Sequence, residues 1–179
     1  CTFDKYTAAD KWQKDIKQSA QWFVADHTGK WFDIGGQVGC GKTHICTAIV
    51  GELMRQGMES RYILWRDETI RLKNLINDES YYSETGKLKT VPVLYIDDLF
   101  KTGKDERGKR KPPSPADIQI TFVLLRSQYN DRDLVTILSS ELISDELLDV
   151  DEAIGSSIYQ RTKEHCWTLT QDRRKNCRL

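Results

Sequence analysis

A glycine-rich segment at residues 36–44 has the residue types and the spacing of a phosphate-binding loop. Residues 36–43 fit the pattern G-x-x-x-x-G-K-[S/T] without a mismatch, between an apolar run and an amphipathic helical pattern. Glycines let the backbone approach phosphates, so that peptide N–H groups and a helix N-terminus face the negative charge. Lys42 is expected to reach the β and γ phosphates, and the Thr43 hydroxyl to bind Mg²⁺. The residues expected to contact a nucleotide are Gly36, Gln37, Val38, Gly39, Cys40, Gly41, Lys42, Thr43 and His44.

Two adjacent aspartates, Asp97 and Asp98, follow the apolar run of residues 93–96. Like charges at the end of an apolar strand need a cation or hydrogen bonds. An acidic residue after a nearby strand holds the magnesium in nucleotidases with such a loop, so Asp97 is the predicted metal residue. Asp98 is predicted to polarise the attacking water, and the alternative is that it only caps the strand end. Aspartate is shorter than the glutamate more often found there. Two possibilities therefore stay open: slow hydrolysis, and hydrolysis that depends on a neighbouring subunit to order the site.

The elements that must position these residues alternate between apolar runs and helical patterns. The expected strands are residues 31–34, 62–65, 91–96, 134–138 and 165–170. Helices are expected from about Thr7 to before Gly29, from Thr43 to near Gly57, from Asp67, from Pro115, and over 142–149 and 151–163. Strands separated by helices predict an α/β fold with a central parallel sheet of about five strands, covered on both faces.

Finer expectations concern helix ends, buried faces and connections. Thr7 and Asp10 resemble the two ends of a capping box. The side chains expected to face inward are Ile70, Leu72, Leu75 and Ile76 on one helix and Ile118, Phe122, Leu125 and Tyr129 on another. Residues 77–90 are expected to form a polar connection, and residues 101–115 a mobile loop.

Composition places the chain among globular proteins with one domain over residues 1–179. Its 27 basic and 27 acidic residues give no net charge, so a polyanion would have to meet local patches. No apolar run approaches the roughly 20 residues of a membrane span, and no signal peptide opens the chain. Five cysteines without a CxxC pair favour reduced thiols in the cytoplasm and give no metal site. The start at Cys1 predicts a fragment with a further domain upstream.

Basic side chains in two places are candidates for DNA contact. Residues 101–115 contain six basic and two acidic residues, a net charge of +4. The candidates are Arg71 and Lys73 on the helix after the second strand, and Lys109, Arg110 and Lys111 in the loop. Binding through them should weaken steeply with salt. The alternative is a solvated charged face.

Four segments together resemble the AAA+ ATPase domain of DnaC/DnaI-type helicase loaders, especially phage versions, with the IstB transposition ATPases as close relatives. They are GGQVGCGKTH, YIDDLF, ILSSELISDELLDVDEAIGSSIYQR and RRKNCRL. The resemblance covers nearly the whole chain and implies a three-layer P-loop NTPase of the AAA+ (ASCE) class. It also implies that the nucleotide is ATP and that a helicase-binding domain lies upstream of Cys1.

The resemblance assigns further roles. Among Ser139, Ser140 and Glu141, Ser140 is favoured as the polar residue that senses the γ-phosphate. Arg161 is the candidate arginine finger that reaches the ATP of a neighbouring subunit, with a surface arginine as the alternative. Arg178 resembles a phosphate-contacting arginine in cis, with a frayed basic terminus as the alternative.

The function implied is that of an ATP-driven loader. Such a protein forms an ATP-bridged spiral or ring, binds single-stranded DNA and delivers a replicative DNA helicase. Three alternatives stay open: an IstB-like transposition helper, a P-loop small-molecule kinase with the basic loop as its lid, and a non-hydrolysing ATP-gated binding module.

Overall fold

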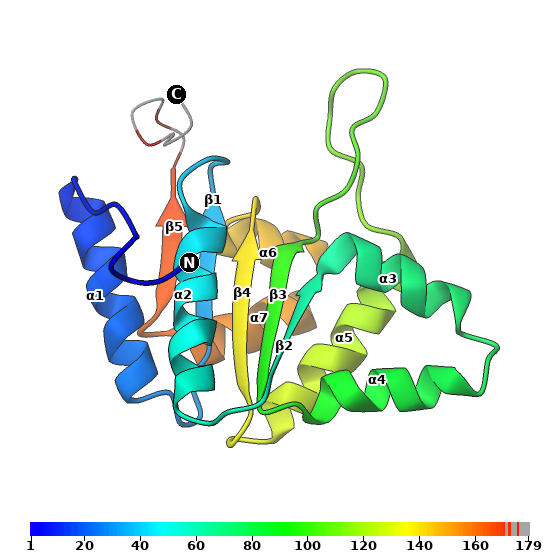
Figure 1. Ribbon diagram of the computed structural model, residues 1–179. Helices are drawn as coiled ribbons and strands as arrows, with labels where there is room; N and C mark the ends of the chain where they lie inside the picture. The colour runs from blue at the N-terminus through cyan, green and yellow to red at the C-terminus, as the bar shows by residue number, and fades with distance from the viewer. Residues whose placement is uncertain (171, 173–174, 176–179) are drawn as a thin grey trace.

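Helices cover both faces of a five-stranded parallel sheet (Figure 1). The computed structural model describes residues 1–170, 172 and 175. The strands are β1 (Phe32–Gly36), β2 (Ser60–Leu64), β3 (Val93–Leu99), β4 (Val135–Ser140) and β5 (Cys166–Leu169). The helices are α1 (Lys11–Ala25), α2 (Lys42–Arg55), α3 (Trp65–Asn74), α4 (Ser80–Thr90), α5 (Pro115–Asn130), α6 (Ser144–Val150) and α7 (Glu152–Thr162). The predicted three-layer α/β fold is confirmed.

The strands lie in the order β2, β3, β4, β1, β5, and all neighbours are parallel. Parallel neighbours need crossover connections, which the intervening helices supply. Parallel strands also end at one common edge, the upper edge in Figure 1. That edge carries the loop between β1 and α2 and the aspartates of β3, so the topology brings the two sequence motifs together.

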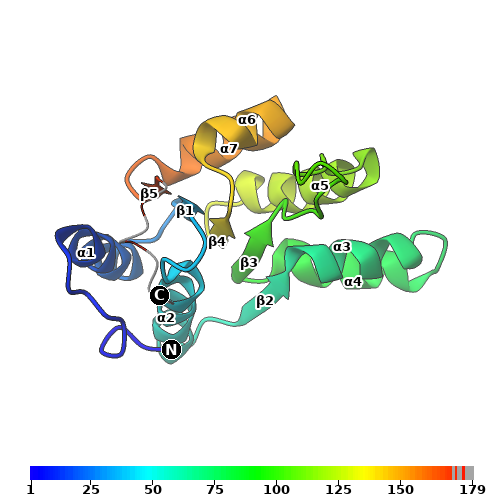
Figure 2. The same ribbon diagram turned by 90° about the horizontal axis from the view of Figure 1, so that it is seen from above.

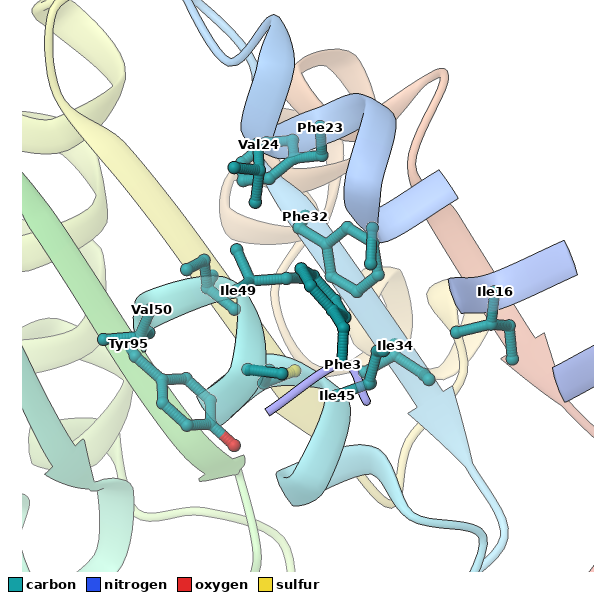
Figure 3. Close-up of a cluster of buried hydrophobic side chains, with 14 of the residues drawn as sticks. Phe3, Ile16, Phe23, Val24, Phe32, Ile34, Ile45, Ile49, Val50 and Tyr95 are labelled. Atoms are coloured by element: carbon teal, nitrogen blue, oxygen red, sulfur yellow. The ribbon is translucent and has the colours of Figure 1, made fainter. Parts of the chain in front are cut away.

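Side chains on the two faces of the sheet belong to two separate cores. Phe32 and Ile34 of β1 face α1 and α2, where they join Phe23, Ile45 and Ile49 (Figure 3). On β3, Leu94 and Ile96 face the opposite way, into the core that α3, α4, α5, α6 and α7 cover (Figure 2). Strands buried on both faces explain the nearly continuous apolar runs in the sequence.

Several finer predictions are wrong. The N-cap of α1 is Asp10, whose backbone N–H donates to Gln13 Oε1 at 3.0 Å, so the capping box begins three residues later than Thr7. Residues 80–90 form α4 where a polar connection was expected; its weakly amphipathic sequence buries only Thr85 and Leu88. Tyrosines and lysines on the other faces of α4 hid the helical period.

The inward faces of α3 and α5 were predicted only in part, since Leu72 and Leu125 are buried as expected. Ile70 and Ile76 are 46% and 55% exposed, whereas Leu72 is fully buried as expected. On α5 the buried residues include Ile120, Leu124 and Leu125, so the buried stripe is rotated from the one expected. Ile118, Phe122 and Tyr129 are partly buried at its margin.

Among the residues that the structure describes, no helix is long and apolar enough to cross a membrane.

Candidate nucleotide-binding site

The loop between β1 and α2 has a conformation that glycine makes possible. Gly36, Gly39 and Gly41 have φ values of 107°, 83° and 81°, in the region that other residues rarely occupy. A Cβ on Gly36 would lie 2.1 Å from the carbonyl oxygen of Leu169 in β5. The next residue, Gln37, donates its N–H to the same oxygen at 2.9 Å. The end of β5 therefore fixes the first half of the loop.

The Lys42 side chain turns back over the loop that precedes it. Its Nζ donates to the carbonyl oxygens of Gly36 and Gln37, both at 2.7 Å. Burial lowers the pKa of Lys42, whereas the negative groups nearby, Glu141 and Asp98 among them, favour its charged form. An ammonium group held by two neutral carbonyls is ready to exchange them for phosphate oxygens, which compensate its charge better.

Asp97 is a buried carboxylate that accepts hydrogen bonds from hydroxyl groups of three elements. Thr43 Oγ1 at the start of α2 donates to Oδ1 at 3.3 Å, and Tyr62 on β2 donates to Oδ2 at 3.2 Å. Ser139 on β4 donates to Oδ1 as well. The carboxylate lies at the end of β3, beside the first turn of α2, as the sequence predicted for a magnesium residue.

The oxygens at this point fit a magnesium ion that also binds phosphate. Mg²⁺ prefers hard oxygen ligands and keeps several waters, with one or two carboxylates and the phosphates of a substrate. Thr43 and Asp97 offer a hydroxyl and a carboxylate side by side. A magnesium ion held by Thr43 and Asp97 would take phosphate and water as its other ligands. Within the described residues there is no cluster of three or more His, Cys, Asp or Glu side chains that could hold a metal.

Asp98 faces the cleft from a strained turn. Its φ of 55° lies in the left-handed region, as does that of Phe100 at 56°, and the pairing of β3 with β4 shifts register between Ile96 and Leu99. The carboxylate binds the Nζ of Lys101 at 2.9 Å. Asp98 lines a cleft of about 300 Å³ together with the loop residues Val38, Gly39, Gly41, Lys42, Thr43 and His44, and with Lys101 and Glu141.

The positions of the two serines at the end of β4 differ from the expectation that Ser140 senses the γ-phosphate. Ser140, the favoured sensor residue, is fully buried; its hydroxyl donates to Leu99 O at 2.7 Å and accepts from Leu142 N at 3.0 Å. Alternation along the strand turns the Ser139 hydroxyl toward Asp97. Glu141, beyond the strand, reaches the cleft. The geometry thus favours Ser139 and Glu141 over Ser140 for contact with the site.

Arg161 has a structural position that does not suit an arginine finger. It is 9% exposed, and its guanidinium donates to the carbonyl oxygens of Gly29, Tyr129 and Asp131 at 2.6, 2.6 and 3.1 Å. The same group lies 5.1 Å from the ring centroid of Tyr129 and 5.9 Å from that of Trp31. These contacts join α7 to the segment after α1 and to the end of α5 within one chain, a position that does not favour the predicted contact with a neighbouring subunit.

The predicted DNA-contacting residues divide into two groups. Arg71 binds Glu68 and Glu84, at 2.6 and 2.9 Å, and Lys73 binds Asp117 at 2.7 Å, so carboxylates of the chain already compensate both cations. Lys109 and Lys111 are exposed in the loop after β3. Arg110 binds Glu141 at 3.0 Å. Arg178 lies outside the described residues.

Sequence patterns did not indicate several residues that border the site. Tyr6 packs edge-on against His44 at 5.5 Å between ring centroids, and His44 Nε2 lies 3.2 Å from Thr2 O, so the N-terminal segment covers the first turn of α2. Tyr62 and Lys101 touch the two aspartates. Each belongs to a segment whose position only the tertiary fold defines, and no local motif marks it.

A phosphate-binding loop between a parallel strand and a helix, with an acidic pair ending a nearby strand, defines a P-loop nucleotide-binding domain of the AAA+ type. Residues 3–174 match the sequence model of the family described as IstB-like ATP binding protein. The chain belongs to this family, and the suspected relationship is confirmed.

Comparisons with individual proteins agree with this assignment. The chain is 33% identical to the uncharacterized protein YqaM of Bacillus subtilis (strain 168) over 171 residues, which are 95% of this chain and 51% of that protein. It is 28% identical to the replicative helicase loader DnaI of the same organism over 119 residues, 66% of this chain and 35% of DnaI. The crystal structure of the DnaC helicase loader is similar in fold, with a TM-score of 0.74, 20% identity and coverage of 96% of both chains. The chain spans about half the length of the first curated relatives it matches.

Proposed function

We propose that this domain hydrolyses ATP with the help of a magnesium ion. The proposal rests on the position of Asp97 and Asp98, which lie at the end of β3 beside Thr43 and Lys42 of the phosphate-binding loop. Members of the family bind ATP, as its description states. Hydrolysis requires more than binding, and the two aspartates beside the loop offer carboxylates for the magnesium ion and for the attacking water.

Each residue has a separate part in the proposed reaction. Lys42 exchanges the carbonyls of Gly36 and Gln37 for the β and γ phosphates and neutralises part of their charge. Thr43 and Asp97 would hold the magnesium ion, which would supply electrostatic stabilisation to the phosphate oxygens. Asp98 accepts a hydrogen bond from the attacking water and orients it toward the γ-phosphate, after its carboxylate has left Lys101.

We infer a role in loading a replicative DNA helicase onto single-stranded DNA. Sequence similarity to DnaI and the shared fold with DnaC support this role, and the exposed lysines after β3 offer a surface for DNA phosphates. An assembly bridged by ATP and a helicase-binding domain upstream of Cys1 belong to the same proposal. The contacts of Arg161 with backbone carbonyls of its own chain favour another cation as the bridging group.

The test uses the full-length protein. ATP turnover is measured with and without single-stranded DNA, and nucleotide products are separated by chromatography. We expect release of inorganic phosphate, stimulation by DNA and co-purification of a replicative helicase. Transfer of phosphate to a small molecule would instead identify a kinase, and ATP binding without product formation would identify a binding module.

A transposition helper is the second candidate, because the matching family model carries the description IstB-like. The site geometry is the same for both roles. Recovery of a transposase in place of a helicase with the full-length protein would decide for it.

A further inference from the structure

A continuous series of ion pairs joins the candidate catalytic carboxylate to the basic loop after β3. Asp98 Oδ2 lies 2.9 Å from the Nζ of Lys101, which lies 3.0 Å from Glu141 Oε1. The other carboxylate oxygen of Glu141, Oε2, lies 3.0 Å from Arg110 Nη2. Lys101 thus shares its charge between two carboxylates, and Glu141 shares its charge between two cations.

The loop that carries Arg110 projects from the carboxyl edge of the sheet, the edge that also carries the loop between β1 and α2 (Figure 1). It folds back on itself through an antiparallel bridge between Lys104 and Arg110. Asp105 N donates to Lys109 O at 2.8 Å, and Lys111 N donates to Gly103 O at 2.9 Å. These backbone contacts hold the two sides of the hairpin together, so a ligand bound at Lys109 or Lys111 would lie next to Arg110.

The pKa values of Lys101 and Glu141 both depend on the ion pairs that join these two side chains to each other and to their other partners. Burial disfavours the charge of Lys101, but its hydrogen bonds to Asp98 and Glu141 outweigh burial and raise its pKa. Burial likewise disfavours the charge of Glu141, and the contacts with Lys101 and Arg110 lower its pKa. Without Arg110, Lys101 would be the remaining cation paired with Glu141, and the attraction between these two side chains would be stronger. The ion pair between Lys101 and Asp98 would therefore weaken.

We propose that the hairpin of residues 101–114 binds the phosphates of single-stranded DNA through Lys109, Arg110 and Lys111 and thereby releases Asp98 from Lys101. The inference rests on the proposed ATPase function. DNA phosphate competes with Glu141 for the Arg110 guanidinium, because both offer paired oxygens to it. Glu141 then holds Lys101, and Asp98 turns toward the attacking water. In the absence of DNA, the ion pair with Lys101 keeps Asp98 from accepting a hydrogen bond from that water.

The test measures steady-state ATP turnover of Arg110→Gln in the full-length protein, with and without an oligothymidylate. Loss of Arg110 imitates the DNA-bound state, so basal kcat should rise about two- to fivefold, the range that a partly exposed ion pair supplies. The KM for ATP should not change, because the affected carboxylate is not a phosphate ligand. Stimulation by the oligothymidylate should shrink by a similar factor.

Two variants serve as controls. Lys104→Gln removes the same charge from the facing side of the hairpin, where no contact with Glu141 occurs, and should keep the wild-type basal kcat. Arg110→Lys keeps a cation for Glu141 and should restore most of the low basal rate.

The outcomes separate the two proposals. Equal basal kcat for Arg110→Gln and Lys104→Gln would overturn the coupling while leaving the ATPase function intact. Binding of oligothymidylate that leaves wild-type turnover unchanged would overturn the coupling too. A wild-type protein that releases no phosphate from ATP would overturn both.

Discussion

The hydroxyl of Thr43 and the carboxylate of Asp97 lie 3.3 Å apart, although 54 residues separate them in the sequence. One begins a helix and the other ends a strand, and both stand at the carboxyl edge of the sheet. A hydroxyl and a carboxylate in this relation, next to a phosphate-binding loop, have the oxygen chemistry that a phosphate-bound magnesium ion prefers.

Asp97→Asn should weaken the part of ATP binding that depends on magnesium. The amide can still accept hydrogen bonds from Thr43 and Ser139, so the fold is preserved, but its neutral oxygen attracts a cation less. We expect a loss of about 10- to 100-fold in magnesium affinity of the ATP complex. Equilibrium titrations of a fluorescent ATP analogue, with magnesium and with EDTA, measure it. Equal magnesium dependence in wild type and variant would contradict the assignment.

Arg161→Ala should destabilise the domain. Three backbone carbonyls lose a charged donor, and the space beside Trp31 and Tyr129 opens. We expect the free energy of unfolding to fall by about 2–4 kcal/mol, measured by urea denaturation. Lys163→Ala is the matched control, because Lys163 is exposed and lies two residues after Arg161. Its free energy of unfolding should be close to that of wild type. Unchanged stability of Arg161→Ala, together with inhibition of wild-type protein in mixed assemblies, would restore the arginine-finger interpretation.

Asp33 should make stability depend on pH. Its side chain is fully buried, Oδ2 accepts a long contact of 3.8 Å from Cys166 Sγ, and Oδ1 has no hydrogen-bond partner among the described residues. Burial raises the pKa of Asp33 to about 7, from the ordinary 3.8. Between these values the folded state holds a proton that the unfolded state has lost, so stability falls as pH rises from about 4 to about 7.

Asp33→Asn removes this titration. Urea midpoints of the variant should vary less than those of wild type between pH 5 and pH 8, and the variant should be the more stable protein at pH 8. Each unit by which the pKa differs between the folded and unfolded chains corresponds to about 1.4 kcal/mol. Asp149→Asn, exposed on α6, should follow the wild-type profile. Parallel profiles for wild type and Asp33→Asn would contradict the prediction.

Local patterns predicted those parts of the molecule that local chemistry determines. The phosphate-binding loop follows from glycine conformations and the position of Lys42, and Pro115 begins α5 as expected. The roles of Ser139 and Ser140 depend on which face of β4 each occupies, which a one-residue shift in register would exchange. Lys101 and Glu141 meet only because β3 and β4 are adjacent in the sheet, and no single segment encodes that contact.

Arg161 illustrates a different limit. An arginine on an amphipathic helix has the same sequence signature whether it points to a neighbour or folds back on its own chain. Three carbonyls decide between these positions, one in the segment after α1 and two at the end of α5, and they come from segments distant in sequence. Resemblance alone suggested the first position, and tertiary packing gives the second.

ATP turnover by Asp98→Asn tests the central claim most directly. Asparagine tolerates the left-handed backbone of this position and is nearly isosteric, so folding and ATP binding should stay as in wild type. The account predicts that kcat falls by about 10²- to 10⁴-fold, with the affinity for ATP and magnesium unchanged. Turnover equal to wild type at saturating ATP, with single-stranded DNA present, would show that Asp98 does not act on the attacking water and would contradict the account.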